Sequence, residues 1–495
     1  MLGEVVREAA RRFGDTVAQV AASGWEVTYA DLDRLSDEVA AGFRTRGLRE
    51  GDVVALVLPS VPEYAIAYLG AAKAGLVTAG VNPRLSATER DAVLSVADPR
   101  LVLATAELAP RAGDIVEVTP AAHGDSALAG VRARGETVPD LPDDPDRPVA
   151  IIFTSGTTGA PKGAVFGVRQ LRAITAIDVG DRWGGGGRSL WGTALSHLGF
   201  MTKFAGNLRQ GGTAHLTLRW RADEHLRFIA EHRMGYVSGI PTQVALMLRV
   251  PDLDHYDLSC VKAIVMGGGP ATPALVREAR ARFAAPLSVR YSCTEAGIGV
   301  GTSFDDPDED AEVSVGRPLP GVELALRDAD DRPVAAGEIG AVCLRSPAVM
   351  TGYYRDPEAS TAAFTADGFV RTGDLGRLDE QGRLHLAGRT KEMYVRGGYN
   401  VYPFEVESVL SQHPDVAAVA VVPLDDPVMG EVGVAFVVPR RRDKPPALAE
   451  LRRFGQDRLA AYKLPERVVA VDELPLTAGE KVDRRALAEI VASEP

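Results

Sequence analysis

A ten-residue loop, 154–163, places the tightest constraint on what this chain can fold into. It reads Thr-Ser-Gly-Thr-Thr-Gly-Ala-Pro-Lys-Gly and follows the apolar run 149–153, which predicts a buried strand. Four hydroxyl side chains, three glycines and one lysine cannot build a hydrophobic core. They can offer a polyanion hydroxyl donors, backbone N–H groups and a cation. We therefore predict a strand that leads into a phosphate-binding loop.

This loop differs at two positions from the P-loop of many nucleotide-binding proteins, G-x-x-x-x-G-K-[ST]. The spacing from Gly156 to Lys162 agrees, but Pro161 replaces the second glycine and has no N–H group for a phosphate. Gly163 stands where Ser or Thr would bind magnesium. The sequence thus predicts a phosphate loop of another kind, with its metal bound elsewhere. The candidate phosphate-binding residues are Thr154, Ser155, Gly156, Thr157, Thr158, Gly159 and Lys162.

Length and charge bound the class of protein. A chain of 495 residues is too long for one core, so two or more domains are expected. The formal net charge of −12 argues against a nucleic-acid partner. The three cysteines are far apart and form no C-x-x-C pair, which predicts a reducing compartment. No signal peptide or bilayer-spanning run is found, so we expect a cytoplasmic monomer or homodimer without an integral membrane segment.

Alternating strand and helix patterns predict a multidomain α/β fold. Apolar runs at 53–58 and 76–81 flank a helical pattern at 59–74, which favours parallel strands with crossover helices. Short strands within 316–345 predict a small β-barrel-like subdomain. Other expected elements are helices at 4–13, 29–42 and 447–462, strands at 101–104, 262–266, 416–422, 433–438 and 467–471, a strand–turn–helix at 236–247, and a loop at 107–148.

Further signatures follow the loop in order along the chain. They lie at 291–295 (Tyr-Ser-Cys-Thr-Glu), 368–374 (Gly-Phe-Val-Arg-Thr-Gly-Asp), 388–392, 395–407 and 474–484. Together with the loop, they resemble the adenylate-forming superfamily, which includes acyl-CoA synthetases, nonribosomal adenylation domains and firefly-type luciferases. The resemblance spans nearly the whole chain. It implies a large N-terminal domain of two α/β layered subdomains plus the barrel-like subdomain, followed by a small mobile α+β domain.

The resemblance implies a nucleotide site for ATP and Mg²⁺. Tyr291 is expected to stack on adenine, Thr294 to bind the α-phosphate and Glu295 to bind Mg²⁺, a hard cation that prefers carboxylate oxygen. Asp374 is expected to accept hydrogen bonds from both ribose hydroxyls. The ATP and AMP site is completed by Gly268, Gly269 and Pro270 beside adenine, Ser292 in place of the usual glycine, and Arg389 at the ribose or phosphates.

The resemblance also assigns roles to the C-terminal part. We expect domains at 1–387 and 392–495, joined by a hinge at 388–391 that contains Lys391. Gly397, Gly398 and Tyr399 are expected to line a CoA tunnel after the domain rotates. Lys481 falls on the family's catalytic lysine, and Glu480 replaces the glycine that normally precedes it. The expected catalytic residues are Lys481, Thr294, Glu295 and His197.

The expected acyl pocket has no aspartate to pair with an amino acid, which favours a plain carboxylic acid. A single histidine is more often structural than catalytic, but the position of His197 resembles that of a family residue facing the acyl group. The other pocket candidates are Phe200, Met201, Ser238, Gly267 and Cys293. We therefore expect an acid–CoA ligase that uses ATP, Mg²⁺ and CoA. The alternatives are a stand-alone ligase that loads a separate carrier protein or an amine, and a non-catalytic adenylate-binding protein.

Overall fold

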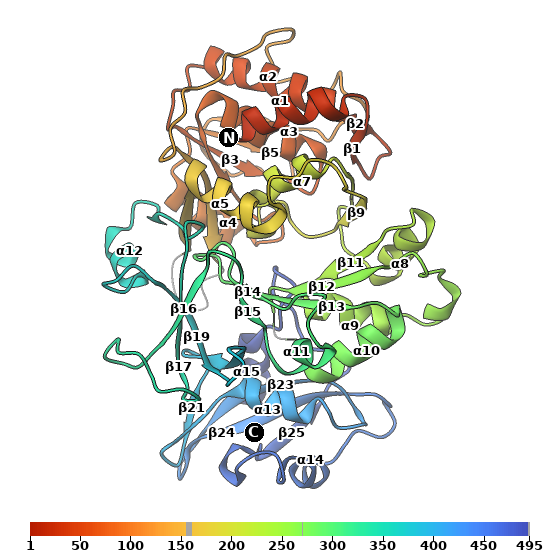
Figure 1. Ribbon diagram of the computed structural model, residues 1–495, viewed down its shortest axis with the longest axis vertical. Coiled ribbons are helices and arrows are strands. Elements are labelled where there is room, and N and C mark those ends of the chain that lie inside the picture. Colours follow the sequence, from red (N-terminus) through yellow and green to blue (C-terminus); the bar gives the residue numbers. More distant parts are fainter. Residues whose placement is uncertain (155–160, 270, 494–495) are drawn as a thin grey trace.

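The computed structural model describes residues 1–154, 161–269 and 271–493. Its strands form five sheets (Figure 1), and the chain is a mixed α/β protein with a large N-terminal part and a small C-terminal domain. In Figure 1 the N-terminal α/β unit lies at the top, a second α/β unit at the right, an antiparallel sheet at the left and the C-terminal domain at the bottom.

The largest sheet has seven strands in the order β18-β8-β7-β4-β3-β5-β6. Its strands are Gly352–Tyr353 (β18), Lys162–Gly167 (β8), Pro148–Thr154 (β7), Val77–Gly80 (β4), Val53–Val57 (β3), Leu101–Ala104 (β5) and Ile115–Glu117 (β6). The pairs among β3 to β7 are parallel, as the strand–helix alternation predicts. β7 pairs antiparallel with β8, so the loop predicted at 154–163 connects two neighbouring strands.

Helices pack on this sheet as their apolar patterns predict. α1 (Leu2–Phe13), α2 (Tyr29–Thr45), α3 (Pro62–Ala74) and α4 (Ala87–Ala97) belong to this unit. Thr28 caps α2 by accepting the N–H of Asp31, and α3 stops because Gly75 adopts φ +77°. α3 is almost wholly buried, since it lies between the sheet and the outer helices α1 and α2.

A smaller sheet joins two distant parts of the chain. Its order is β2-β1-β10-β9, with bounds Glu26–Thr28 (β2), Val17–Val20 (β1), Thr213–Leu216 (β10) and Arg188–Trp191 (β9). The Tyr29 hydroxyl donates to the Gly212 carbonyl at 2.7 Å beside this sheet. Between β8 and β10 lie α5 (Val168–Val179), α6 (Leu198–Met201) and α7 (Phe204–Gln210).

The second α/β unit carries a five-stranded sheet in the order β11-β12-β13-β14-β15. Its strands are Tyr236–Gly239, Ala263–Gly267, Leu287–Tyr291, Val300–Gly301 and Arg317–Pro318. Its helices are α8 (Ala222–Glu231), α9 (Pro241–Leu248), α10 (Pro273–Phe283) and α11 (Asp308–Val313). β11 to β13 are parallel and bury their apolar side chains in a core with the helices.

Four antiparallel strands occupy the segment predicted to be barrel-like. They are β16 (Glu323–Arg327), β17 (Gly340–Arg345), β19 (Val370–Leu378) and β20 (Leu384–Arg389), and α12 (Pro357–Ala363) lies between β18 and β19. Within the described residues, the end strands β16 and β20 each pair with one neighbour of this sheet. The expected hinge, 388–391, covers the end of β20 and the turn that follows it.

The C-terminal domain has a sheet that contains β22 (Tyr399–Val401), β21 (Tyr394–Arg396), β24 (Gly430–Pro439), β23 (Val416–Asp426) and β25 (Arg467–Ala470). Its helices are α13 (Pro403–Leu410), α14 (Leu448–Gly455) and α15 (Arg484–Ser493). The helix predicted at 447–462 is too long, because α14 ends at Gly455, a residue of low helix propensity. The missing side chain there leaves room for Leu464, which would lie 2.6 Å from an added Cβ. The loop predicted at 107–148 was also incomplete, since it contains β6.

Candidate active site

The residues expected to bind ribose come together on three strands. Tyr291 ends β13, Asp374 lies within β19 and Arg389 ends β20, directly opposite Asp374 in the strand register. The Tyr291 hydroxyl donates to Asp374 Oδ2 at 2.8 Å, and Arg389 Nε donates to Asp374 Oδ1 at 2.9 Å. Asp374 is buried with 8% of its surface exposed. The carboxylate is thus fixed by one neutral and one charged donor.

The phenol of Tyr291 stays protonated in this arrangement. Burial, and then the negative charge of Asp374, raise the pKa of Tyr291 well above its usual value. A protonated hydroxyl can donate to Asp374 across the physiological pH range. The ring itself packs in the largest hydrophobic core, so both ends of this side chain are held.

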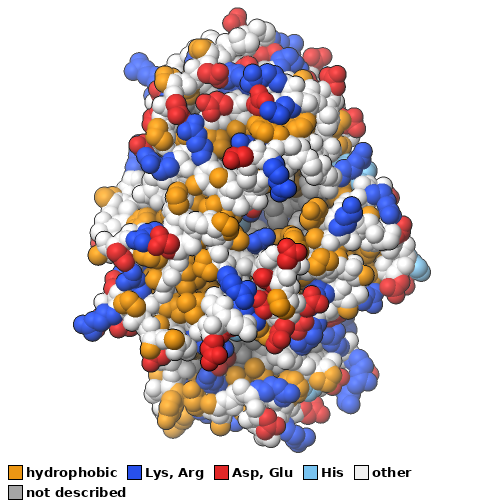
Figure 2. Space-filling view, in the orientation of Figure 1, with side chains coloured by type: hydrophobic (Ala, Val, Ile, Leu, Met, Phe, Trp, Pro, Cys, Tyr) orange, Lys and Arg blue, Asp and Glu red, His pale blue; other side chains and the backbone are white. Residues whose placement is uncertain are grey.

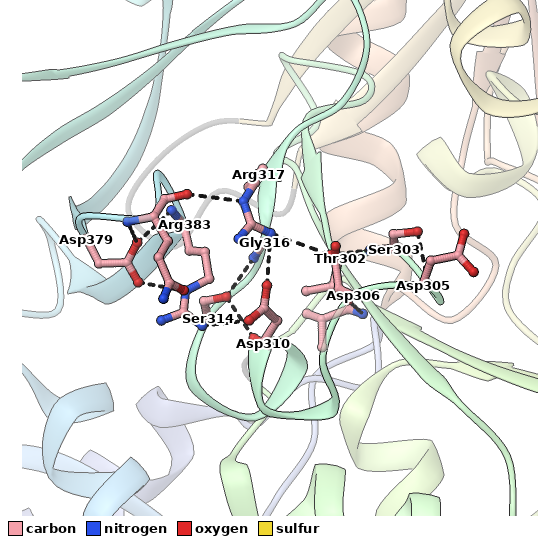
Figure 3. Close-up of polar contacts among 12 residues, drawn as sticks. Thr302, Ser303, Asp305, Asp306, Asp310, Ser314, Gly316, Arg317, Asp379 and Arg383 are labelled. Carbon is pink, nitrogen blue, oxygen red and sulfur yellow. Dashed lines mark hydrogen bonds and ion pairs between the residues drawn. The ribbon is translucent and has the colours of Figure 1, made fainter.

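A network of ion pairs braces the two sheets that meet here (Figure 3). Asp310 on α11 accepts from Arg317 Nη1 at 2.8 Å and from Arg383 Nη1 at 2.6 Å. Arg383 Nε also donates to Asp379 Oδ2 at 2.7 Å. Burial alone would raise the pKa of Asp310, but the two arginines lower it below its usual value. The network ties the second α/β unit to the β19–β20 hairpin, and so fixes Tyr291 relative to Asp374.

Glu295, the expected metal ligand, lies in the turn after β13. The Tyr353 hydroxyl donates to Glu295 Oε1 at 2.7 Å, and Lys162 Nζ lies 5.2 Å from the centre of the Tyr353 ring. Tyr353 therefore links the start of β8 to the expected metal ligand. Sequence reasoning missed Tyr353, since no spacing connects β18 to either partner.

Glu295, a single carboxylate, suits magnesium that is bound together with a nucleotide. Across 1–154, 161–269 and 271–493, no group of three or more His, Cys, Asp or Glu side chains could hold a metal ion alone. Magnesium commonly takes one or two carboxylates plus substrate phosphate oxygens. The half-buried carboxylate of Glu295 fits that pattern. The residues Ser155, Gly156, Thr157, Thr158, Gly159 and Pro270 lie outside the described residues, whereas Thr154 ends β7 and Lys162 begins β8.

Lys481 is brought to this site on a tight turn of the C-terminal domain. The turn is closed by Thr477 N–H donating to the Lys481 carbonyl at 2.7 Å and by Glu480 N–H donating to the Thr477 carbonyl at 2.9 Å. In Figure 1 the violet C-terminal chain rises into the centre of the molecule, and Figure 2 shows this face hollowed between the two α/β units.

The charge of Lys481 interacts with residues on both the expected ribose side and the expected acyl side. The Lys481 side chain is accessible, yet the surrounding protein partly desolvates its ammonium group. This desolvation, and then the positive charge of Arg389, lower the pKa of Lys481, whereas the negative charge of Asp374 raises it. On the acyl side, desolvation and then the Lys481 charge lower the pKa of His197 to about 4. His197 also caps α6 by accepting the Gly199 N–H at Nδ1, 3.4 Å away. The imidazole is consequently neutral at pH 7.

The expected acyl-pocket residues divide into an accessible group and a core group. Ser238 on β11 is exposed, and Gly267 ends β12 opposite Arg290, whose carbonyl oxygen would lie 2.8 Å from an added Cβ. Phe200 packs 4.6 Å from the Phe204 ring, and Met201 is 0% exposed. These two side chains belong to the core behind the α6 segment.

The remaining predicted nucleotide-site and pocket residues lie in the turns that follow β13 and β12. Burial, and then Glu295, raise the pKa of Cys293 well above its usual value, so its thiol is neutral and a poor nucleophile. Ser292 Oγ donates to the Cys293 carbonyl at 3.1 Å, and Thr294 lies in the same turn as Glu295. Gly268 adopts φ +81°, and Gly269 follows it.

The expected CoA-tunnel residues form the turn of the β21–β22 hairpin. Gly397 and Gly398 adopt φ +55° and +85°, which suits a two-residue hairpin turn. Tyr399 is 59% exposed, and its ring stacks on Tyr462 with centroids 4.6 Å apart. This hairpin is an exposed edge of the C-terminal sheet. Lys391 lies in the turn between β20 and β21.

Comparisons with known proteins cover almost the whole chain. The family described as AMP-binding enzyme matches residues 6–354, and the AMP-binding enzyme C-terminal domain matches residues 405–481. The chain is 32% identical to the fatty acid–acyl-carrier-protein ligase ScoC of Streptomyces coeruleorubidus (95% of this chain, 93% of the relative). It is 32% identical to the medium/long-chain-fatty-acid–CoA ligase FadD8 of Mycobacterium tuberculosis (92% and 84%).

The fold is similar to that of solved structures as well. The amide bond synthetase McbA of Marinactinospora thermotolerans superposes with a TM-score of 0.87 at 30% identity, covering 99% of this chain and 100% of that chain. Among the described helices, none combines the length and the apolar character needed to cross a membrane.

Proposed function

Because the chain belongs to the adenylate-forming superfamily of AMP-binding enzymes, we propose that this ligase is a carboxylic acid–CoA ligase. The observation that carries the proposal is the docked position of the Lys481 turn, whose neighbouring Glu480 contacts Arg84 and Gln243 of the two N-terminal units. That position suits the first of two half-reactions. The proposed domains are 1–387 and 392–495, which rotate about 388–391 between the two steps. The proposed compartment is the cytoplasm, which agrees with the three free thiols.

In the proposed first step, a carboxylate oxygen attacks the α-phosphorus of ATP, and the bond to the bridging oxygen breaks. Acyl-AMP and pyrophosphate result. The main barrier is the approach of two anions, and the ammonium of Lys481 lowers it by placing positive charge where negative charge accumulates. Lys162 is proposed to bind the departing phosphates. A bound Mg²⁺ at Glu295 would supply further neutralisation of the phosphate charge.

The remaining residues position the reactants. Each oxygen of a carboxylate can accept two hydrogen bonds, and one position on each oxygen of Asp374 is used by Tyr291 or Arg389. One position per oxygen is left for the two ribose hydroxyls. Neutral His197 can lie beside the acyl group without repelling Lys481. Positioning of this kind supplies much of the catalysis in reactions that need no protein nucleophile.

In the proposed second step, a thiol sulfur attacks the acyl carbon, the bond from that carbon to the AMP oxygen breaks, and the thiol proton passes to solvent. We propose that CoA supplies this thiol after rotation brings the 397–399 hairpin to the site. The exposure of Tyr399 in the present arrangement leaves that hairpin accessible for such a movement.

A pyrophosphate-release assay tests the proposal. Purified full-length protein is incubated with ATP, Mg²⁺ and a panel of short, medium, long-chain and aromatic acids, with and without CoA. We expect acid-dependent pyrophosphate release and formation of acyl-CoA when CoA is present. Acid-dependent pyrophosphate release without acyl-CoA would overturn CoA as the acceptor. No turnover with any acid would overturn the enzyme assignment in favour of an adenylate-binding protein.

A separate carrier protein or an amine is the second candidate acceptor. The names of ScoC and McbA favour it, since one similar protein is a carrier-protein ligase and the other an amide bond synthetase. Parallel reactions with a phosphopantetheinylated carrier protein or with amines in place of CoA separate these outcomes.

A further inference from the structure

Glu480, the residue before Lys481, has a backbone conformation that costs energy for its side chain. Its φ is +61°, in the left-handed region that glycine adopts freely and residues with a Cβ avoid. Glycine would adopt this conformation without strain, so the turn itself does not need a carboxylate. A strained residue persists when surrounding contacts hold it in place.

The contacts that hold Glu480 come from both α/β units. Arg84 Nη1 forms an ion pair with Oε1, and Gln243 Nε2 donates to Oε2. Arg84 follows β4 of the seven-stranded sheet, whereas Gln243 lies on α9 of the second unit. One carboxylate of the C-terminal domain thus connects both N-terminal units next to Lys481.

The two partners are themselves fixed. Arg84 Nη2 donates to the Gly192 carbonyl at 3.2 Å. Gln243 is 2% exposed, and its Oε1 accepts the Ile240 N–H at 3.1 Å. The bond from Ile240 therefore orients the Gln243 amide independently of Glu480, with its NH₂ group toward that carboxylate.

This ion pair is less exposed than another one across the same domain boundary. The side chains of Arg84 and Glu480 are 29% and 17% exposed. Arg440 and Glu278 pair at 3.3 Å, with 44% and 37% exposed. Solvent screens the exposed pair more strongly, so the pair at Glu480 has the greater influence on docking.

We propose that Glu480 is a positioning residue that locks the Lys481 turn for acyl-adenylate formation. The inference rests on the proposed function, because it assigns Glu480 to one of the two half-reactions. The carboxylate must leave Arg84 and Gln243 before the C-terminal domain rotates for the thiol step. Glu480 therefore favours adenylation and opposes rotation, and its loss affects the two half-reactions differently.

The Glu480→Gly variant tests this role, because glycine relaxes the backbone and removes only the side-chain contacts. We expect adenylation to slow about tenfold, as when an interaction with a charged group is lost. Thioester formation from supplied acyl-AMP should be unchanged or faster. If Glu480 merely shaped the turn, Glu480→Gly would adenylate as fast as the wild type, and that result would overturn the proposal. Equal slowing of both half-reactions would also overturn it.

Three further single variants and one double variant test the contact. Arg84→Met should slow adenylation alone, and the double variant with Glu480→Gly should be no slower than the more severe single variant; additive losses would contradict a direct coupling. Glu480→Gln retains a group that can accept from Gln243, so it should be intermediate. Glu278→Gln, which removes the exposed pair, is the matched control and should leave both rates unchanged.

Hydrogen–deuterium exchange of the apo protein separates this proposal from the proposed function. The peptide covering 474–484 should be protected in the wild type and in Glu278→Gln, and should exchange faster in Glu480→Gly. Equal exchange in wild type and Glu480→Gly would overturn the lock. If no acid is activated by the wild type but the exchange difference appears, the proposed function fails while the lock is supported.

Discussion

The two sides of the candidate site are held in place by different means. The expected ribose side, Tyr291 and Asp374, lies on strands whose pairing fixes the side chains, and Asp310 braces the sheets behind them. Lys481 instead lies on a turn whose position depends on contacts between domains. The comparison suggests that folding sets one side, whereas docking sets the other. The variants below each change one of these two sides.

The largest effect is expected at Lys481. Lys481→Ala should slow adenylation about 10²–10³-fold, as loss of a group that stabilises transition-state charge does. Conversion of supplied acyl-AMP to thioester should be spared. The two half-reactions are measured separately by pyrophosphate release and by thioester formation. Equal losses in both would contradict the assignment of Lys481 to the first step.

A loss of stability is expected when Asp310, the centre of the ion-pair network, is replaced. Asp310→Ala leaves the arginines at positions 317 and 383 without their buried partner and should lower the free energy of unfolding by about 3 kcal/mol. Because folding lowers the pKa of Asp310, its stabilising effect is present above the unfolded pKa and is lost as pH falls below about 4. Urea unfolding at pH 7 and pH 3 checks this. A difference between variant and wild type that is equal at both pH values would contradict it.

A smaller effect is expected at the ribose side. Asp374→Asn removes the ionised acceptor and should weaken AMP binding roughly tenfold, the magnitude of a lost hydrogen bond to a charged group. Isothermal titration calorimetry measures the affinity. Arg377→Gln, an exposed change on the same strand, serves as the control. If Asp374→Asn binds AMP as the wild type does, ribose recognition lies elsewhere.

The smallest effect is expected on the pKa of His197, which the charge of Lys481 influences. Because the Lys481 charge contributes to lowering the pKa of His197 to about 4, Lys481→Met should raise that pKa by less than about one unit. The Cε1–H resonance of His197 followed by NMR from pH 3 to 8 measures the midpoint. Lys444→Met, in a distant basic loop, should leave it unchanged. An unchanged midpoint in Lys481→Met would show that the turn is not docked in solution.

Much of the fold could be predicted because local signals coincide with packing. The strand at 101–104 was predicted with the bounds of β5, and the helix from Tyr29 begins after its capping threonine. The helix predicted from 59 begins at Pro62, since the apolar pattern continued through the preceding turn. At 447–462 the periodicity was again misleading, because it continued past Gly455, where α14 ends.

The candidate site was predictable only in part. Motif order predicted Tyr291, Asp374 and Lys481 in one site, and the structure joins Tyr291 to Asp374 by a hydrogen bond, while the charge of Asp374 acts on Lys481. Tyr353 and Arg84 contribute single side chains from short segments with no periodicity or spacing. Their contacts depend on how separate sheets pack, which a local pattern does not encode.

The pairing of the N-terminal strands with β10 has a consequence for synthesis of the protein. Tyr29 and its partner Gly212 are 183 residues apart in the chain. At typical translation rates, the first strands wait on the order of ten to forty seconds after leaving the ribosome before β10 is made. Throughout that interval, β1 and β2 expose an unpaired edge, which is where nascent chains aggregate. Slower translation upstream of β10 should therefore lower the yield of native protein and increase its dependence on chaperones.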